Sequence, residues 1–315
     1  MQTFYQIAGG IAGIALLYYG AEFLIKGGVS IALKLKVPSL IIGLTLVAFG
    51  TSAPELVVSI DAALKGSGDI SIGNVVGSNI CNIALILGLS AAIAPLTVQK
   101  KLLRFDLPLL TAASIFVVLF CFLSRGITRW QGGIFFAGIL AYTAYSIYSG
   151  KKDGSDGCDD EISSSKIYPY YLAAIFVIGG LLGLVAGAKL FVNAAIFIAR
   201  AGGISDAVIG LTVVALGTSL PELATSVVAA VKGEQDIAIG NVIGSNMFNI
   251  LCILGIAPLI SPIHAPTIDL IDLGMMLFLT IALFPIMRTG WKINRAEGAF
   301  LLLIYCGYTA WLFIK

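Results

Sequence analysis

The sequence predicts an all-α integral membrane protein with about ten transmembrane helices, arranged as two inverted repeats of five helices each. Three observations lead to this prediction. The chain is strongly apolar, its apolar residues fall into long segments, and its second half repeats a long stretch of the first half without a gap.

Composition sets the class of protein. Hydrophobic residues make up 58% of the 315 residues and charged residues only 11%, and the mean hydropathy is +1.00. Soluble domains carry about 25% charged residues, so this chain is suited to a lipid environment. The formal net charge of +2 gives no reason to expect a nucleic-acid partner. The five cysteines follow neither a disulfide framework nor a zinc pattern, and no cofactor motif is present.

Ten apolar segments are long enough to be transmembrane helices, since a bilayer core takes about 20 residues. They are Phe4–Leu33, Ser39–Leu64, Ile70–Ile93, Leu107–Leu123, Trp130–Tyr148, Tyr170–Ala199, Ala207–Val231, Ile237–Ile260, Ile268–Met287 and Ala296–Phe313.

The basic residues between these segments predict the orientation. Most Lys and Arg residues lie on the side opposite the N-terminus, so the positive-inside rule places both termini outside the cell. The polar stretch 150–168 is then a cytoplasmic linker between a first repeat, 1–149, and a second repeat, 169–315. The sequence thus predicts a multi-pass protein of the cell membrane.

The internal duplication gives the architecture. A shift of 167 positions places residues 207–263 on residues 40–96, and about 33 of these 57 aligned positions are identical. Because each copy has an odd number of helices, the second must enter the membrane from the opposite side. Many secondary transporters are built this way, with the substrate site near the membrane centre where the repeats meet.

The first repeated motif is GTSAPE at 50–55 and GTSLPE at 217–222. Its proline cannot donate a backbone hydrogen bond, so each helix should be interrupted inside the membrane. We expect the break to free the carbonyls of Ala48 and Ala215, about one turn earlier. Irregular backbone at this depth is tolerated only against protein or a water-filled cavity.

The second repeated motif is GNVVGSNICN at 73–82 and GNVIGSNMFN at 240–249. Polar side chains recur in it every fourth residue and therefore share one helix face. They are Asn74, Ser78 and Asn82 in the first copy and Asn241, Ser245 and Asn249 in the second. A cation site and plain interhelical hydrogen bonding would both select these residues.

A carboxylate closes the first motif in each copy, Glu55 and Glu222. An ionisable group at the centre of a span costs at least about 2.5 kcal/mol, so its presence in both copies indicates a function. Two carboxylates with hydroxyl, amide and carbonyl oxygens suit Ca²⁺, Na⁺ or Mg²⁺ rather than zinc or copper. The alternative is a capping box, in which Ser52 caps the helix and Glu55 closes back onto the backbone.

Other charges within or beside the spans are weaker signals. Glu22 and Lys26 are spaced to form an ion pair on one helix, and Lys189 occupies the matching region of the second repeat. Asp69 and Asp236 open the third and eighth helices, where capping is the expected role.

The two motifs, present once in each half, resemble the alpha repeats of the cation/calcium exchanger superfamily, and in particular prokaryotic sodium/calcium exchangers. The resemblance implies antiport of Ca²⁺ against Na⁺ by alternating access, with the ions held between the second, third, seventh and eighth helices. It also implies no enzymatic activity. Some archaeal and potassium-dependent exchangers carry Asp where this chain has Asn249, which weakens the case for potassium co-transport.

The resemblance further implies a set of cation ligands, carried over residue by residue. They are Glu55, Glu222, Thr51, Ser52, Thr218, Ser219, Ser78, Asn82, Ser245 and Asn249, together with the carbonyls of Ala48 and Ala215.

Alternative functions remain open at this stage. Protonation of Glu55 or Glu222 would give a proton-coupled exchanger of Ca²⁺ or another divalent cation, and the same ligands in a pore would give a cation channel. An intramembrane enzyme is disfavoured, because the spans contain no HExxH pair, Asp dyad or Ser/Lys pair. Both repeats lie in one chain, so a monomer in the lipid bilayer is the expected state, and the Gly-rich first and sixth helices are the expected moving parts.

Overall fold

The computed structural model describes residues 2–153, 167–202 and 215–314. In the first of these ranges the helices form five consecutive segments. They are α1 (Gln2–Leu35); α2 (Ser39–Ile42), η1 (Gly43–Val47), α3 (Ala48–Thr51) and α4 (Ala53–Leu64); α5 (Gly68–Ile80), η2 (Cys81–Leu87) and α6 (Gly88–Ile93); η3 (Leu102–Asp106) and α7 (Leu107–Ser124); and α8 (Arg129–Asp153). The elements written η are π-helical.

The other two ranges contain five further segments. They are α9 (Tyr170–Ala201); α11 (Ala215–Thr218) and α12 (Leu220–Val231); α13 (Gln235–Met247), η5 (Phe248–Ile253) and α14 (Leu254–Ile260); α15 (Leu270–Arg288); and α16 (Arg295–Ile314). The predicted start of the seventh span at Ala207 and most of the predicted linker lie outside the described residues, and the division at 150–168 stays a prediction.

The membrane class predicted from composition is confirmed. By length and composition, six helices in the described part of the chain can cross a membrane, and a seventh span is bent by 47° between Ser39–Thr51 and Ala53–Leu64. The α13–η5–α14 segment is 83% buried over its most apolar window, against 28% for α9. The core of the molecule is therefore formed by the third and eighth spans, and α9 lies at the periphery.

The duplication in sequence is also a duplication in structure. The tight turns after α4 and α12 contain Gly66 and Gly233, which are 167 positions apart and have φ of 72° and 82°. Two short antiparallel strand pairs recur in the same way. β1 (Leu96–Thr97) pairs with β4 (Lys292–Ile293), and β2 (Gly126–Ile127) pairs with β3 (Ile263–His264). Each pair joins a connection of one repeat to a connection of the other, so the two repeats are interlocked.

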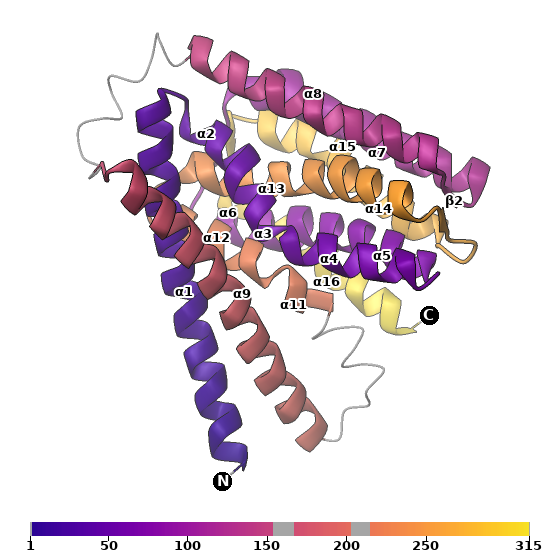
Figure 1. Ribbon diagram of the computed structural model, residues 1–315, viewed down its shortest axis with the longest axis horizontal. Helices are drawn as coiled ribbons and strands as arrows, with labels where there is room; N and C mark the ends of the chain where they lie inside the picture. Colours follow the sequence, from indigo (N-terminus) through magenta and orange to yellow (C-terminus); the bar gives the residue numbers. More distant parts are fainter. Residues whose placement is uncertain (1, 154–166, 203–214, 315) are drawn as a thin grey trace.

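The helices α1 and α9 lie side by side and extend beyond the rest of the bundle (Figure 1). Glycines bring them into backbone contact. A Cβ atom on Gly13 would lie 2.8 Å from the carbonyl oxygen of Gly187, and one on Gly20 would lie 2.9 Å from that of Gly180. Because Gly13 and Gly20 match Gly180 and Gly187 in the duplication, the contact is itself symmetric between the repeats.

The two aspartates expected to cap helices lie in the first turns of α5 and α13, and each also bonds to the opposite repeat. Asp69 accepts a hydrogen bond from the backbone N–H of Thr267 at 2.9 Å, and Asp236 accepts one from the side-chain amide of Gln99. Each carboxylate therefore holds a connection of the opposite repeat. The expected ion pair between Glu22 and Lys26 is present at 2.8 Å, and Lys232 adds a second contact to Glu22 at 3.0 Å.

Candidate cation-binding site

Two helices begin inside the membrane, as the prolines predicted. α4 starts directly after Ser52 (φ −84°, ψ 6°) and α12 after Ser219 (φ −86°, ψ 4°), with a proline in the first turn of each. These non-helical serines set the bend, because the proline nitrogen that follows has no hydrogen to continue the helix. Each break leaves a glutamate in the first turn of the new helix, and both Glu55 and Glu222 are buried.

The expectation that this break frees the carbonyl of Ala48 is wrong. That oxygen accepts a hydrogen bond from the backbone N–H of Ser52 at 3.0 Å. The physical reason is spacing, since the missing N–H of Pro54 would have bonded four residues back, to Gly50. A carbonyl oxygen has two lone pairs, and the hydroxyl of Thr51 also lies 3.4 Å from the oxygen of Ala48. In the second repeat, the N–H of Ser219 donates to the carbonyl of Leu216 at 3.1 Å, and Ala215 opens α11.

Each carboxylate is held by a serine of the opposite repeat. The hydroxyl of Ser52 donates to Oε1 of Glu222 at 2.8 Å, and the hydroxyl of Ser219 donates to Oε1 of Glu55 at 3.3 Å. Neither serine makes a side-chain capping bond at the start of its own helix. The capping-box interpretation of this motif is therefore wrong, and the crossed bonds bring the two glutamates together at the interface of the repeats.

The threonines before these serines lie at the same place. Thr218 contacts Glu55, as Thr51 contacts Glu222. Thr51 also donates to the side-chain oxygen of Asn241 at 3.1 Å. Four hydroxyl groups thus lie beside the two carboxylates, and they belong to the residues that the family resemblance implied.

Several buried oxygens face no donor. Among the described residues, the buried side-chain oxygens without a hydrogen-bond partner include Oε2 of Glu55, Oε2 of Glu222, Oδ1 of Asn82, Oδ1 of Asn249 and Oγ of Ser245. A buried polar atom without a partner costs about 1–3 kcal/mol, so a group of them calls for an explanation. All five are hard oxygens of the kind that bind Ca²⁺ and Na⁺.

Two asparagine pairs fix the direction of these amide oxygens. The amide nitrogen of Asn82 donates to Oδ1 of Asn246 at 3.0 Å, and that of Asn249 donates to Oδ1 of Asn79 at 3.1 Å. With its nitrogen engaged, each of Asn82 and Asn249 has its oxygen on the other side of the amide, without a hydrogen-bond partner among the described residues. Sequence reasoning missed Asn79 and Asn246, although both lie in the repeated GSN tripeptide.

The first asparagine of each stripe has a supporting role. Asn74 donates to the backbone carbonyl of Glu55 at 3.2 Å and to the hydroxyl of Ser59 at 2.9 Å. Asn241 makes the same two bonds to Glu222 and Ser226. These asparagines lock the first turns of α4 and α12 in place. Interhelical hydrogen bonding therefore explains this part of the stripe, while Ser78 lies buried one turn before Asn82.

The third and eighth spans change from α-helix to the wider π-helix beside these asparagines. The π-helical segments η2 and η5 begin at Cys81 and Phe248, which are 167 positions apart and immediately precede Asn82 and Asn249. π-Helical turns inside α-helices are often found at functional sites. A second feature that the sequence did not reveal is Thr225, one turn after Glu222, whose buried hydroxyl has no partner among the described residues. Its counterpart in the first repeat is Val58, so the duplication gave no signal.

The composition of the site limits its chemistry. In the described part of the chain, no group of three or more His, Cys, Asp or Glu residues is placed to hold a metal ion. The described site is made mainly of two carboxylates and neutral oxygens, and the thiol of Cys81 lies beside Ser219. Two carboxylates and many oxygens match a hard cation by charge.

Comparison with known proteins gives the family. The chain matches the sodium/calcium exchanger protein family over residues 5–148 and 172–314. It is 39% identical over 313 residues to CaxA of Alkalimonas amylolytica, covering 96% of this chain and 97% of CaxA. It is 34% identical over 339 aligned residues to the sodium/calcium exchanger MaX1 of Methanosarcina acetivorans, covering 96% of this chain and 97% of MaX1.

A solved structure agrees with these matches. The sodium-calcium exchanger NCX_Mj, soaked with zero Na⁺ and Ca²⁺, has a TM-score of 0.85 and 33% identity, covering 98% of this chain and 99% of that chain. The agreement confirms the predicted all-α membrane fold of two inverted five-helix repeats. The chain thus belongs to the sodium/calcium exchanger family, within the cation/calcium exchanger superfamily.

Proposed function

We propose that this member of the family exchanges Ca²⁺ for Na⁺ by alternating access, with the cations bound between Glu55 and Glu222. The observation that supports this proposal is the crossed pair of serine–glutamate bonds, which joins one carboxylate from each inverted repeat at a buried site. The proposed ligands are the two glutamates with Thr51, Ser52, Thr218, Ser219, Ser78, Asn82, Ser245, Asn249 and the carbonyls of Ala48 and Ala215. Thr225 joins them as a further candidate.

Charge explains why such a site would exchange ions. Two carboxylates balance one Ca²⁺, whereas an empty site would carry two uncompensated charges through the protein, which is costly. The ion-loaded protein therefore switches its binding site from one side of the membrane to the other, and the empty protein does not. If more than two Na⁺ replace each Ca²⁺, the sodium-loaded form carries excess positive charge and transport responds to membrane voltage.

The burial of the site favours a carrier over a channel. Glu55 is fully buried and Glu222 is 1% exposed, so the carboxylates are enclosed by protein. We assign the motion to α1 and α9, whose contact is formed by glycine backbones and extends away from the bundle. The distribution of Lys and Arg supports termini outside the cell and a cytoplasmic linker, and one chain contains both halves of the site, so the functional unit is a monomer in the bilayer.

Radiolabelled Ca²⁺ uptake into proteoliposomes tests the proposal. Vesicles loaded with Na⁺ and diluted into Na⁺-free buffer should take up Ca²⁺, and vesicles loaded with K⁺ should not. Glu55→Gln and Glu222→Gln should each abolish uptake. Asp106→Asn is the matched control, because Asp106 is also a fully buried carboxylate but pairs with Tyr142 away from the site.

The other outcomes identify the competing functions. Uptake that needs a pH jump and not internal Na⁺ would make the protein a proton-coupled exchanger. Uptake with no requirement for a counter-ion would make it a channel. Sodium-dependent uptake that persists in Glu55→Gln would show that this carboxylate is not needed for ion binding. Competition of Mg²⁺ with Ca²⁺ uptake would add Mg²⁺ to the cations that the site accepts.

A further inference from the structure

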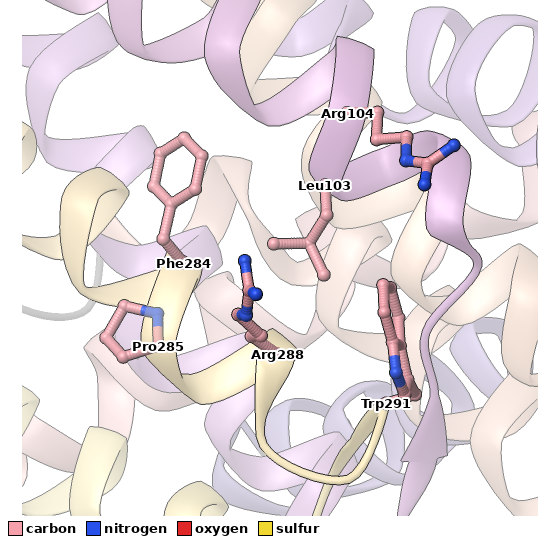
Figure 2. A pocket seen from close by; sticks show the side chains of 6 residues that line it. All are labelled: Leu103, Arg104, Phe284, Pro285, Arg288 and Trp291. Carbon is pink, nitrogen blue, oxygen red and sulfur yellow. The ribbon is translucent and has the colours of Figure 1, made fainter.

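A second site lies where η3 and α7 pack against α15. A cavity of about 430 Å³ is lined there by Leu103, Arg104, Phe284, Pro285, Arg288 and Trp291. Figure 2 shows Arg288 extending between Phe284 and Trp291, with Arg104 beyond Leu103. The lining thus combines two cationic groups from different helices with an apolar floor.

No carboxylate of the described residues pairs with either guanidinium group. No residue that lines the cavity is acidic, and within the part of the chain that the structure describes neither Arg104 nor Arg288 takes part in an ion pair or a side-chain hydrogen bond. A third cation is close, since Nζ of Lys100 lies 5.9 Å from the centre of the Trp291 ring. This concentration of positive charge selects an anion, and paired guanidinium groups suit a phosphate.

The backbone under the tryptophan is held in an unusual conformation. Trp291 has φ of 56°, a value that bulky residues rarely adopt. Its carbonyl oxygen accepts a hydrogen bond from the N–H of Val98 at 2.9 Å, next to the β1–β4 pair, which keeps the turn in place. Trp291 is 41% exposed, as expected of a tryptophan at the border between membrane and water.

The packing of the two helices does not itself require the arginines. In this region the repeats are offset by 166 positions, as the matching Tyr142–Asp106 and Tyr308–Asp272 hydrogen bonds show. With this offset, the position that matches Arg104 in the other repeat is Leu270, and the position that matches Arg288 is Phe122. The same fold therefore carries two apolar side chains at one end and two guanidinium groups at the other.

The outer face of α15 leads from the apolar region to the cationic one. Phe278 is 53% exposed and Ile281 is 48% exposed, and the exposed face continues through Pro285 to Arg288 at the end of the helix. An acyl chain lying along this face would bring its headgroup to the two arginines. A free phosphate ion would use the charge but not the apolar face.

From these features we propose that the cavity binds the headgroup phosphate of an anionic phospholipid, with Arg104 and Arg288 as the phosphate ligands, Trp291 at the headgroup level and the acyl chain along α15. Anionic lipids are concentrated in the cytoplasmic leaflet, which is the side that the proposed orientation gives to this end of the protein. The site lies outside the cation site and does not depend on which ion drives exchange.

Lipid binding to the purified full-length protein tests this site. Phosphatidylglycerol and phosphatidylcholine are added in detergent, and bound lipid is counted by native mass spectrometry. The Arg104→Gln/Arg288→Gln variant should bind phosphatidylglycerol about thirtyfold more weakly, the combined contribution of two basic side chains at an anionic surface. The matched control is Arg125→Gln/Arg129→Gln, which removes two exposed arginines from the other end of the bundle. It should bind phosphatidylglycerol like the parent protein.

Three results would overturn the proposal. The first is an equal loss of phosphatidylglycerol binding in both double variants, which would indicate a general effect of net charge. The second is unchanged binding in Arg104→Gln/Arg288→Gln. The third is displacement of the lipid by inorganic phosphate at equal concentration, which would make this a site for a free anion. Monodisperse elution of each variant on size exclusion shows that it is folded, and Arg104→Lys/Arg288→Lys should keep part of the affinity because it keeps the charge.

Discussion

One ion pair links α1, the helix that we propose moves during transport, to α12 in the core of the protein. Oε1 of Glu22 on α1 lies 2.8 Å from Nζ of Lys26 on the same helix and 3.0 Å from Nζ of Lys232 at the end of α12. The substitution Lys232→Met removes only the contact between the helices. Glu22 keeps Lys26, so no buried charge is left alone.

The size of the effect follows from the exposure of the pair. The side chain of Glu22 is 16% exposed and that of Lys232 is 32% exposed, so the pair is neither fully buried nor free in solvent. Exposed ion pairs contribute about 0.2–1 kcal/mol, and partial burial places this one near the top of that range. Loss of about 1 kcal/mol would shift the equilibrium away from the arrangement in which α1 packs on α12 by about fivefold.

The inverted repeat supplies the control. Lys65 is 167 positions before Lys232 and ends the matching helix, but it pairs with Asp61 of its own helix at 2.6 Å. The residue that matches Glu22 in the second repeat is Lys189, which cannot pair with a lysine. Lys65→Met therefore removes the same charge from the same position of the fold without breaking a bond between helices.

Spin labels on α1 and α12, with distances measured by double electron–electron resonance, give the population of each arrangement. Lys232→Met should increase the population with longer distances, and Lys65→Met should leave the distribution unchanged. Equal distributions in the parent protein and Lys232→Met would show that the ion pair does not hold α1. An equal shift in both variants would assign the effect to net charge.

Two further predictions concern packing and buried charge. Gly20→Ala should lower the free energy of unfolding by about 1–3 kcal/mol, because the new methyl group meets the backbone of α9 at 2.9 Å. Gly9→Ala should leave it unchanged, because a methyl group there has nothing within 4 Å. Thermal unfolding of both variants in detergent checks this, and equal unfolding midpoints would contradict it. Tyr142→Phe should cost about 1.5–3 kcal/mol, because it removes a hydrogen bond at 2.9 Å to the fully buried Asp106. Tyr308→Phe should cost less, since the matching carboxylate is partly exposed and water can replace the hydroxyl, so a reversed order in the same unfolding assay would refute this reasoning.

The duplication explains why so much could be predicted. A carboxylate and a proline kept in both copies, in the middle of apolar spans, were sufficient to predict two broken helices and a shared site at Glu55 and Glu222. The orientation of the repeats followed from the odd number of helices in each. These conclusions depend on chain topology and on the cost of burying charge, both of which can be read from one sequence.

Contacts between the repeats could not be read in the same way. The alternative in which Ser52 caps its own helix arose because the spacing to Glu55 is local and visible, whereas the partner of Ser52, Glu222, is 170 residues away. The ion pair of Glu22 with Lys232 was missed for the same reason. Thr225 was missed because the first copy has valine at that position, so comparison of the two halves gave it no weight.

The crossed serine–glutamate bonds also bear on how such a protein can arise. Each repeat supplies a carboxylate to the site and the hydroxyl that holds the carboxylate of the other, so the site needs two oppositely oriented copies but not two different ones. A single five-helix chain, inserted into the membrane in both directions, would build the whole site as an antiparallel homodimer. Fusion of two copies into one gene fixes their opposite orientations and then lets matched positions diverge. Glu22 and Lys189 are such a divergence, because identical subunits cannot carry opposite charges at one position.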